Sequence, residues 1–471
     1  MANSVQKRGT IVTLLLAGTF IAILNQTLMI TAIPPIMEEM GITANSAQWL
    51  TTIFMLINGI MIPISAFLID RFTTRQLFLT AMSVFAVGTL VAALAPNFSV
   101  LLAGRIIQSA GAGVMLPLMQ TVFLMIFPVN KRGSVMGLVG LVISFAPAIG
   151  PTLSGWVTEY YSWRVLFYII LPIAIIDIVI AYFVMKNVTE ISKPKLDILS
   201  IIFSSLGFGG LLYGFTSAGN NGWDSPVTIT VLVVGAISLV TFIMRQLKLK
   251  HPMLEFRVFK YSIFPLTVTV GMLSFMGLIA VETLIPLYMQ EARDFTAVDA
   301  GLVILPGALI TGFMSPITGR IFDKIGAKWL AIPGLALMTI GSFLFTILDE
   351  NTSMTYLTVV FAIRMLGISM VMMPIATAGL NQLPKRLIAH GAAMDNTLRN
   401  VSASVGTAIL VTVLTTTETA AEQNGDPFPG IVASNVAFLV LSIITTIGLV
   451  ITFFIKNSRP SDIDQEAYDR D

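Results

Sequence analysis

The stretch LVISFAPAIGPTLSGW, residues 141–156, decides how this chain folds. It is apolar along its length, yet it contains two helix-disturbing residues, Pro147 and Pro151. Small residues recur at every fourth position, at Ala146, Gly150 and Ser154. In a soluble helix, a proline removes a backbone donor and clashes with the preceding turn, so the helix would end here. In a membrane, the freed carbonyls are tolerated where protein or a water-lined cavity satisfies them, so we expect a bent and buried span.

Composition places the whole chain in lipid. Hydrophobic residues make up 55% of the 471 residues and charged residues 11%, whereas a soluble globular protein carries about 25% charged residues. The net charge of +2 argues against nucleic acid as a partner. Because the chain has no cysteine, disulfides, thiol catalysis and iron–sulfur clusters are excluded.

An apolar window predicts fourteen membrane helices, each of about 20 residues or more. The first apolar run begins at Ile11 and is too long for a cleaved signal, so we expect it to be retained. The expected spans are 10–33, 47–69, 77–96, 99–124, 134–156, 163–185, 197–217, 227–247, 263–289, 300–320, 328–348, 354–380, 393–416 and 432–456.

Most of the 27 lysines and arginines fall on one side of these spans, Arg399 among them. Both histidines, His251 and His390, fall in loops on the same side. By the positive-inside rule that side is the cytoplasm, and we expect both termini to lie there. The exceptions are Arg164 and Arg293 in outer loops, and Arg105 and Arg364 within spans.

The chain contains an internal repeat. The second span ends in AFLIDRFTTR, residues 66–75, and the tenth ends in GRIFDKIGAK, residues 319–328. Both read small-x-x-x-Asp-basic, and they are offset by 253 residues. We therefore expect an all-α membrane fold of two six-helix bundles, related as a parallel pseudo-repeat, plus two inserted helices. The predicted boundaries are 1–186 for the first bundle, 187–262 for the inserted helices with their linker, 263–456 for the second bundle, and 457–471 for a disordered cytoplasmic tail.

Five motifs follow one another along the chain. They are LNQTLMITAIPPI (24–36), AFLIDRFTTR (66–75), LAGRIIQSAGAG (102–113), the opening stretch extended back to Gly137, and WRVLFYIILP (163–172). In this order they resemble the major facilitator superfamily, in its fourteen-helix drug:proton antiporter branch. The chain departs from the family's glycines at Ala66, Thr73, Ser109, Ala146 and Ser154. The LNQTL variant is similar to the lincomycin-resistance type of exporter of Gram-positive bacteria, which implies a bacterial plasma membrane.

The resemblance implies that the fifth helix sits between the two halves and favours exchange over leak. Its signature residues are Ala146, Gly150, Pro151, Ser154 and Gly155. Plain helix packing by the small residues is the alternative.

The resemblance also implies a cytoplasmic gate whose charge pairs break when the halves separate. The expected gate residues are Asp70, Arg71, Arg75, Asp323 and Lys324. The alternative is that the basic residues only set the topology.

Four charged residues lie within spans, where each costs about 2.5–3.5 kcal/mol at mid-helix. They are Arg105, Arg364, Asp177 and Glu282. Burial disfavours the charge of an acid, so Asp177 and Glu282 are candidate proton carriers. The resemblance implies that Arg105 influences proton transfer. Structural roles remain the alternatives: a protonated carboxyl bonded to another helix, or an arginine anchored on backbone carbonyls.

The first span carries Asn25 where the family usually has an acid. An amide cannot titrate, so proton coupling through that helix is excluded. Polar side chains in the spans remain available to orient a substrate. The expected cavity residues are Asn25, Gln26, Asn58, Glu282 and Arg364.

An enzyme is not expected, because the chain lacks an HExxH motif, a thiol and a nucleophile–base–acid set. An ATP-driven pump is not expected either, because the chain lacks a phosphate-binding GxxxxGK[ST] loop. No metal or cofactor is expected. We predict a monomeric secondary transporter that exports amphipathic drugs in exchange for protons by alternating access. Two alternatives stay open: an exporter of an endogenous lipid-like or nucleotide-type metabolite, and a transporter-like membrane sensor or scaffold.

Overall fold

The computed structural model describes residues 2–189, 191–192 and 196–456. The tail expected to be disordered, 457–471, lies outside these residues. All regular structure in the described residues is helical, and fourteen helices are long and apolar enough to cross a membrane, which confirms the predicted fold class. The helices are α1 Ala2–Met40, α2 Ala44–Arg71, α3 Thr74–Ala93, α4 Phe98–Ile126, α5 Arg132–Tyr160, α6 Arg164–Val184, α7 Ile198–Asn221, α8 Pro226–Lys248, α9 Ile263–Glu291, α10 Ala297–Ile325, α11 Ala327–Leu344, α12 Met354–Leu380, α13 Ile388–Gln423 and α14 Pro429–Phe453.

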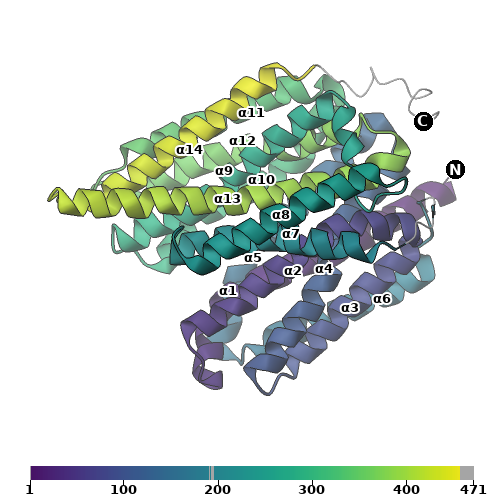
Figure 1. Cartoon of the computed structure of the whole chain (residues 1–471), viewed down its shortest axis with the longest axis horizontal. Coiled ribbons are helices and arrows are strands. Elements are labelled where there is room, and N and C mark those ends of the chain that lie inside the picture. Colours follow the sequence, from purple (N-terminus) through teal and green to yellow (C-terminus); the bar gives the residue numbers. More distant parts are fainter. Residues whose placement is uncertain (1, 190, 193–195, 457–471) are drawn as a thin grey trace.

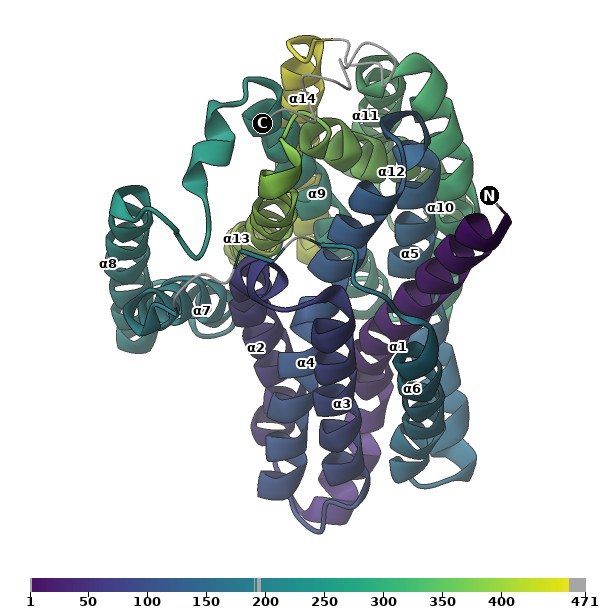
Figure 2. The same cartoon turned by 90° about the vertical axis from the view of Figure 1, so that its right-hand side faces the viewer.

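The first six and the last six helices form two lobes, which we call the N lobe and the C lobe. In Figure 1 the N lobe is purple to blue and the C lobe green to yellow. The most extensive packing between the lobes joins α5 to α10 and α2 to α13. The inserted helix α7 packs on both α2 and α13, and α8 packs on α7 and protrudes from the bundle (Figure 2).

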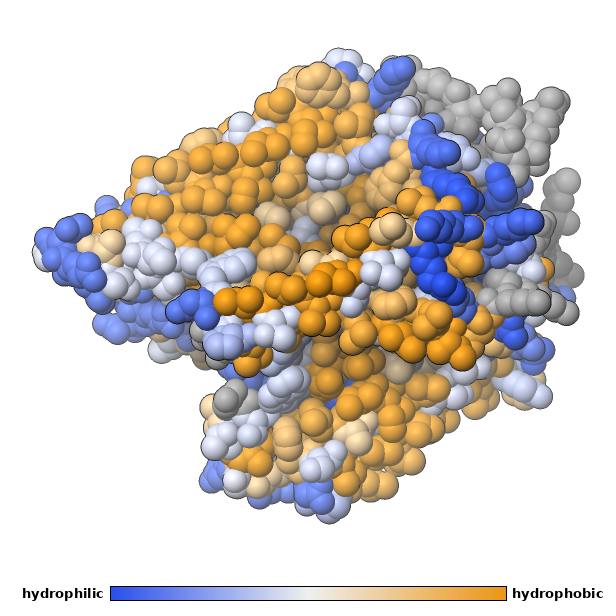
Figure 3. All heavy atoms as spheres, viewed as in Figure 1, coloured by the Kyte–Doolittle hydropathy of each residue, from blue (hydrophilic) through white to orange (hydrophobic). Residues whose placement is uncertain are grey.

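The lobes meet at one end and diverge at the other. We call the end where α1 begins and α14 ends the basic end, because Lys131, Arg132, Lys324 and Arg386 lie there. The basic end is on the right in Figure 1, and the lobes separate toward the left. Figure 3 shows an apolar belt between two hydrophilic ends and a notch between the lobes at the left. The structure is therefore closed at the basic end and open at the opposite end, which we call the open end.

Local sequence explains where the helices begin. The hydroxyl of Thr73 accepts a hydrogen bond from the backbone N–H of Gln76, whose side chain accepts one from the backbone N–H of Thr73. This capping box starts α3, and α10 begins with the same arrangement. Where helix ends are polar, the predicted bounds are too short. Helix α1 runs to Met40 and α13 begins at Ile388, because a hydropathy window does not detect polar turns.

The inserted helices α7 and α8 are held together by close packing and by an ion pair. A Cβ added to Gly210 would lie only 2.9 Å from the Cα of Gly235. Arg245 of α8 donates two hydrogen bonds, of 2.8 and 2.9 Å, to the carboxylate of Asp197 at the start of α7. These bonds from Arg245 lower the pKa of the Asp197 carboxyl below its ordinary value. The two helices therefore form one hairpin.

The hairpin contacts both lobes along one flank. The ring of Tyr213 on α7 stacks on Trp49 of α2, with centroids 5.6 Å apart. Trp223, just after α7, donates a hydrogen bond of 2.7 Å to the hydroxyl of Thr412 on α13. The hairpin thus bridges the lobes in the part of the molecule where they diverge.

Candidate functional site: the interface between the lobes

The lobes touch along a seam of small residues where α5 begins and α10 ends. A Cβ added to Gly133 would lie 2.5 Å from the carbonyl oxygen of Gly319, and one added to Gly137 would lie 2.5 Å from that of Ser315. Small residues permit this approach of two backbones. Midway along α5 the contact becomes aromatic, since Phe145 packs edge-on against a phenylalanine of α10 with centroids 5.0 Å apart.

Asp323, one of the predicted gate residues, joins the two lobes at the basic end of the seam. Its carboxylate accepts hydrogen bonds of 2.8 Å from the backbone N–H groups of Gly133 and Ser134, and another from the Ser134 hydroxyl. These N–H groups belong to the first turn of α5, where they lack helical partners and carry the positive end of the helix dipole. Lys324, its expected neighbour in the gate, is exposed. The contact is therefore a carboxylate on a helix N-terminus.

Asp70, the matching residue of the first repeat, also bridges the lobes. Its carboxylate lies 3.1 Å from Nε2 of His390 in the first turn of α13. Nδ1 of His390 accepts a hydrogen bond of 3.2 Å from the backbone N–H of Glu255. The ring proton is therefore on Nε2, which donates a hydrogen bond to the Asp70 carboxylate. The prediction that His390 lies in a loop was wrong, because the polar first turn of α13 falls outside an apolar window.

The other two predicted gate residues contact their own lobe. Arg75 donates a hydrogen bond of 2.5 Å to the backbone carbonyl of Tyr182 on α6. The guanidinium of Arg71 lies 6.0 Å from the ring centroid of Phe67. A third lobe-to-lobe contact comes instead from Arg132, which donates a hydrogen bond of 2.9 Å to the side-chain oxygen of Asn381, just after α12.

Arg105 is completely buried inside the N lobe. It donates hydrogen bonds to the side-chain oxygens of Asn25 at 2.5 Å and Gln108 at 3.0 Å, and to the backbone carbonyl of Leu50 at 3.2 Å. Its guanidinium lies 4.2 Å over the ring of Phe54. In the described part of the chain no carboxylate contacts it. Asn25, predicted to line the cavity, is buried and bonded to this arginine instead.

Arg364 is completely buried inside the C lobe. It donates hydrogen bonds to the hydroxyl of Ser342 on α11 at 3.2 Å and to the carbonyl of Gly277 on α9 at 2.6 Å. Glu282, on α9, is half-buried and close enough to Arg364 for Coulombic attraction. Among the residues that the structure describes, no hydrogen bond or ion pair reaches the Glu282 carboxylate.

The two arginines occupy equivalent places in the repeat. Each lies on the fourth helix of its lobe and bonds to the first helix of that lobe, α1 or α9. In the N lobe the first helix supplies a neutral amide, Asn25. In the C lobe it supplies an acid near the arginine, Glu282. Only the C-lobe copy can therefore bind and release a proton beside its arginine.

Asp177, the other predicted proton carrier, is buried within the N lobe. Its side chain lies against Gly18 of α1, where an added Cβ would be 2.9 Å from the carboxylate oxygen Oδ2. That oxygen has no hydrogen-bond partner in the described residues. Helix α6 packs mainly on α3 and α1, so Asp177 lies among helices of its own lobe. The structure thus separates Asp177 from Glu282.

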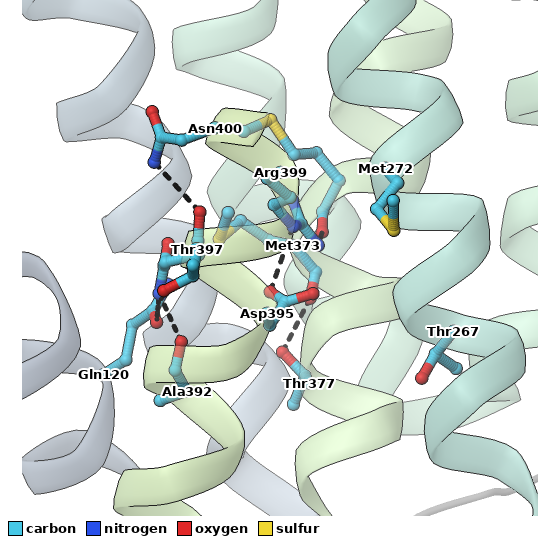
Figure 4. A network of polar contacts seen from close by, with 12 residues as sticks. Gln120, Thr267, Met272, Met373, Thr377, Ala392, Asp395, Thr397, Arg399 and Asn400 are labelled. Carbon is cyan, nitrogen blue, oxygen red and sulfur yellow. Dashed lines mark hydrogen bonds and ion pairs between the residues drawn. The ribbon is translucent and has the colours of Figure 1, made fainter. Parts of the chain in front are cut away.

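The sequence analysis missed a buried ion pair in α13, shown in Figure 4. Asp395 and Arg399 are one turn apart, each 3% exposed, and joined by an N–O distance of 3.0 Å. Arg399 also donates a hydrogen bond of 3.3 Å to the backbone carbonyl of Met372 on α12. Beside them, the side-chain amide of Asn396 donates a hydrogen bond of 2.6 Å across the interface to the side-chain oxygen of Gln120 on α4. The prediction that Arg399 lies in a cytoplasmic segment was wrong; the available signal was an acid and a base four residues apart, which share one helix face.

The signature of α5 packs on α1 of the same lobe. A Cβ added to Gly150 would lie 2.8 Å from the Cβ of Thr27. The hydroxyl of Ser154 donates a hydrogen bond of 2.6 Å to the carbonyl of Leu28. The small residues therefore bring α1 and α5 together toward the open end, whereas the basic-end half of α5 forms the seam.

Two threonines of α1 lie against backbone carbonyls in this part of α5. The hydroxyl of Thr27 donates a hydrogen bond of 3.0 Å to the carbonyl of Leu24 in its own helix and lies 3.4 Å from the carbonyl oxygen of Ala146. The hydroxyl of Thr31 lies 3.5 Å from the carbonyl oxygen of Pro151. A Cβ added to Gly155 would meet no atom within 4 Å. Gly155 therefore makes no close contact, unlike the other glycine of the signature.

The predicted cavity residues do not form one cluster. Gln26 and Asn58 are half-buried on α1 and α2, and the carbonyl of Asn58 would lie 2.9 Å from a Cβ added to Gly113 of α4. Asn25 belongs to the Arg105 cluster of the N lobe, whereas Glu282 and Arg364 belong to the C lobe. A substrate that touches both groups has to lie between the lobes.

A family model described as Major Facilitator Superfamily matches residues 15–407. The chain belongs to this superfamily. It is 56% identical to the uncharacterized MFS-type transporter YcnB of Bacillus subtilis, over 97% of each chain. It is 43% identical to the lincomycin resistance protein LmrB of Bacillus subtilis, over 94% of this chain and 95% of the relative.

A solved structure shares the fold. The human organic anion transporter MFSD10 superposes with a TM-score of 0.67 at 13% identity, over 95% of this chain and 99% of that chain. The resemblance to the fourteen-helix drug:proton antiporter branch is confirmed. The chain is a multi-pass membrane transporter and not an enzyme.

Proposed function

We propose that this transporter exports amphipathic drugs in exchange for protons, by alternating between a form closed at the basic end and a form closed at the open end. The observation that carries the proposal is Glu282, a half-buried carboxylate without a bonded partner in the described residues, beside a completely buried Arg364. The relative named for lincomycin resistance supports a drug as cargo. The positive-inside rule supports a cytoplasmic basic end, and bacterial relatives support the plasma membrane. We propose a monomer, with lipid, protons and a small amphipathic molecule as partners.

Charge on Glu282 has two opposing effects. It attracts Arg364, and it costs free energy in the membrane, about 2.5–3.5 kcal/mol at the centre of a helix. Binding a proton removes both effects. Because Arg364 is bonded to α9 and α11, protonation changes how these helices are held against α12. Coupling requires that this change favour one of the two forms. A cationic drug beside Glu282 would compete with the proton for the same carboxylate.

Opening the basic end requires the lobe-to-lobe contacts there to break. Besides the close packing of α5 on α10, they include the bonds of Asp323 to the start of α5, the Asp70–His390 pair and the bond of Arg132. Each is an ordinary hydrogen bond, with a net contribution of about 0.5–1.5 kcal/mol, or about 1.5–3 kcal/mol when a partner is charged. A few such bonds can hold one form and still be broken by proton or drug binding.

The test uses proteoliposomes of the purified chain with a pH-sensitive dye inside and lincomycin as the probe. The parent should move protons when lincomycin is added, and Glu282→Gln should not. Glu422→Gln, an exposed acid near the end of α13, is the matched control and should behave like the parent. Proton movement by Glu282→Gln at the parent rate would refute the coupling role. A parent that moves protons for neither lincomycin nor a panel of amphipathic cations would refute drug:proton exchange.

A further inference from the structure

An open pocket of about 530 Å³ lies on the flank of the N lobe, away from the interface between the lobes. It forms where α3 begins and α6 ends, so it belongs to the basic end. Figure 2 shows α3 and α6 side by side at the outside of the N lobe. The neighbouring aromatic residues Tyr182 and Phe183 are 56% and 78% exposed, as expected of side chains that face lipid. The pocket therefore lies at the border between the apolar belt and the basic end.

Two basic residues line this pocket, Arg75 and Lys186, and none of its described lining residues is acidic. The guanidinium of Arg75 is held in place by its bond to the carbonyl of Tyr182 and lies 4.9 Å from that residue's ring centroid. Its Nε–H is buried and has no partner in the described part of the chain. Lys186 is exposed. One anchored cation and one exposed cation thus line the same space.

The backbone around the pocket is firmly anchored. Asn187 accepts hydrogen bonds of 3.0 and 3.3 Å from the backbone N–H and the hydroxyl of Thr74. The N–H groups of Val188 and Thr189 donate to the same hydroxyl at 3.2 and 3.3 Å. The linker after α6 is therefore fixed over the first turn of α3, whose positive dipole end adds to the charge of the two basic residues.

The pocket also has an apolar wall, with Leu79, Met185 and the ring of Tyr182 in its lining. A cationic rim above an apolar wall fits a ligand with an anionic head and a hydrocarbon body. Basic pockets between membrane helices on the cytoplasmic side bind lipid phosphates in this way. We propose that this pocket binds the phosphate of an anionic glycerophospholipid. The inference rests on the cytoplasmic position of the basic end proposed above, and it stands whether or not the proposed drug:proton exchange is correct.

The test uses the absence of cysteine, which allows one fluorophore to be attached to Phe183→Cys, an exposed position next to the pocket and outside its lining, without further changes. The full-length protein is placed in nanodiscs that contain equal fractions of spin-labelled phosphatidylglycerol or spin-labelled phosphatidylcholine. Phosphatidylglycerol should quench the fluorophore more strongly. Each basic residue near an anionic lipid contributes about 1 kcal/mol, so Arg75→Gln and Lys186→Gln should each lower this preference by about fivefold.

Lys248→Gln, an exposed lysine at the end of α8, is the matched control and should keep the preference. Lys186 is exposed, so its variant should fold even if Arg75→Gln does not. Equal quenching by the two lipids in the parent, or an unchanged preference in Lys186→Gln, would overturn the proposal. Abolition of the preference by inorganic phosphate in the buffer would assign the pocket to free phosphate and would also overturn the lipid assignment.

Discussion

One added methyl group at Gly319 should change which end of the transporter is closed. In the present form a Cβ at this position would overlap the carbonyl oxygen of Gly133 and lie 2.9 Å from its carbonyl carbon. Both are backbone atoms, which cannot rotate away as a side chain can. They belong to the opposite lobe, so Gly319→Ala is penalised only while the lobes touch at the basic end.

The size of the effect follows from the cost of overpacking, which is about 1–3 kcal/mol. A penalty of about 2 kcal/mol changes the ratio of the two forms by about thirtyfold. If the present form outnumbers the other by about ten to one, the variant should show about one to three. The change is then large enough to be read directly from a distance distribution.

The assay is a spin-label distance measurement between Glu38→Cys and Glu422→Cys, exposed positions near the open ends of α1 and α13. Gly319→Ala should shift the distribution toward shorter distances, since closing the open end accompanies opening of the basic end. Gly301→Ala, on the same helix and with no atom within 4 Å of its added Cβ, should leave the distribution unchanged. The same distribution in the parent and Gly319→Ala would refute the role of the seam, and so would an equal shift in Gly301→Ala.

Three further outcomes test the packing and the charges. Gly150→Ala forces α5 away from α1 and should lower the unfolding temperature in detergent. The added methyl group of Gly155→Ala meets open space, so this variant should keep or raise the unfolding temperature, because glycine is worse than alanine in a helix by about 1 kcal/mol. Equal unfolding temperatures for the two variants would contradict the α1–α5 contact. Asp395→Asn leaves Arg399 buried without its charge partner and should destabilise the protein by about 3–5 kcal/mol in chemical unfolding. Replacing Arg399 as well by an apolar residue should restore part of this stability. An unchanged unfolding midpoint in Asp395→Asn would rule out the ion pair. The ion pair with Arg245 lowers the pKa of the Asp197 carboxyl below its ordinary value of 3.8, so the pair stabilises the fold above that pH and stops doing so as the pH falls through the lower folded value. Asp197→Asn should therefore unfold more easily than the parent at neutral pH, and the difference in stability between the two proteins should shrink in acid. A difference in stability that does not change with pH would contradict this assignment.

The number of helices and their repeat could be predicted from the sequence, because a membrane allows few solutions. Each span must be apolar over its whole length, and this is visible in the residues themselves. The ends of the helices could not be predicted in the same way. The first turn of α13 includes His390, so an apolar window starts the helix at 393 and assigns this polar residue to a loop, whereas the helix begins at Ile388. This turn is nevertheless helical, and Ile388, Ala389 and His390 in it are buried.

The candidate site was harder to predict than the fold, because its partners are remote in sequence and some are backbone atoms. The Asp-basic pattern around Asp323 marked a gate residue, but no pattern marks the N–H groups of Gly133 and Ser134 as its partners. Likewise the replacement of an acid by Asn25 was visible in the sequence. That this amide bonds to Arg105 became visible only when α1 and α4 were placed together.

The asymmetry between the two arginine clusters is consistent with a transporter that couples to protons without an acid in its first span. Under the proposed function, the C lobe responds to the proton, and the response has to reach the seam between α5 and α10. Arg364 lies on α12, which packs on both of these helices. Farther along α12, the side chain of Met373 lies where a Cβ on Gly140 of α5 would be 2.9 Å away. A change at Glu282 can therefore reach the seam through a single helix of the same lobe, whereas the buried Arg105, bonded to neutral partners, can hold the N lobe together in both forms.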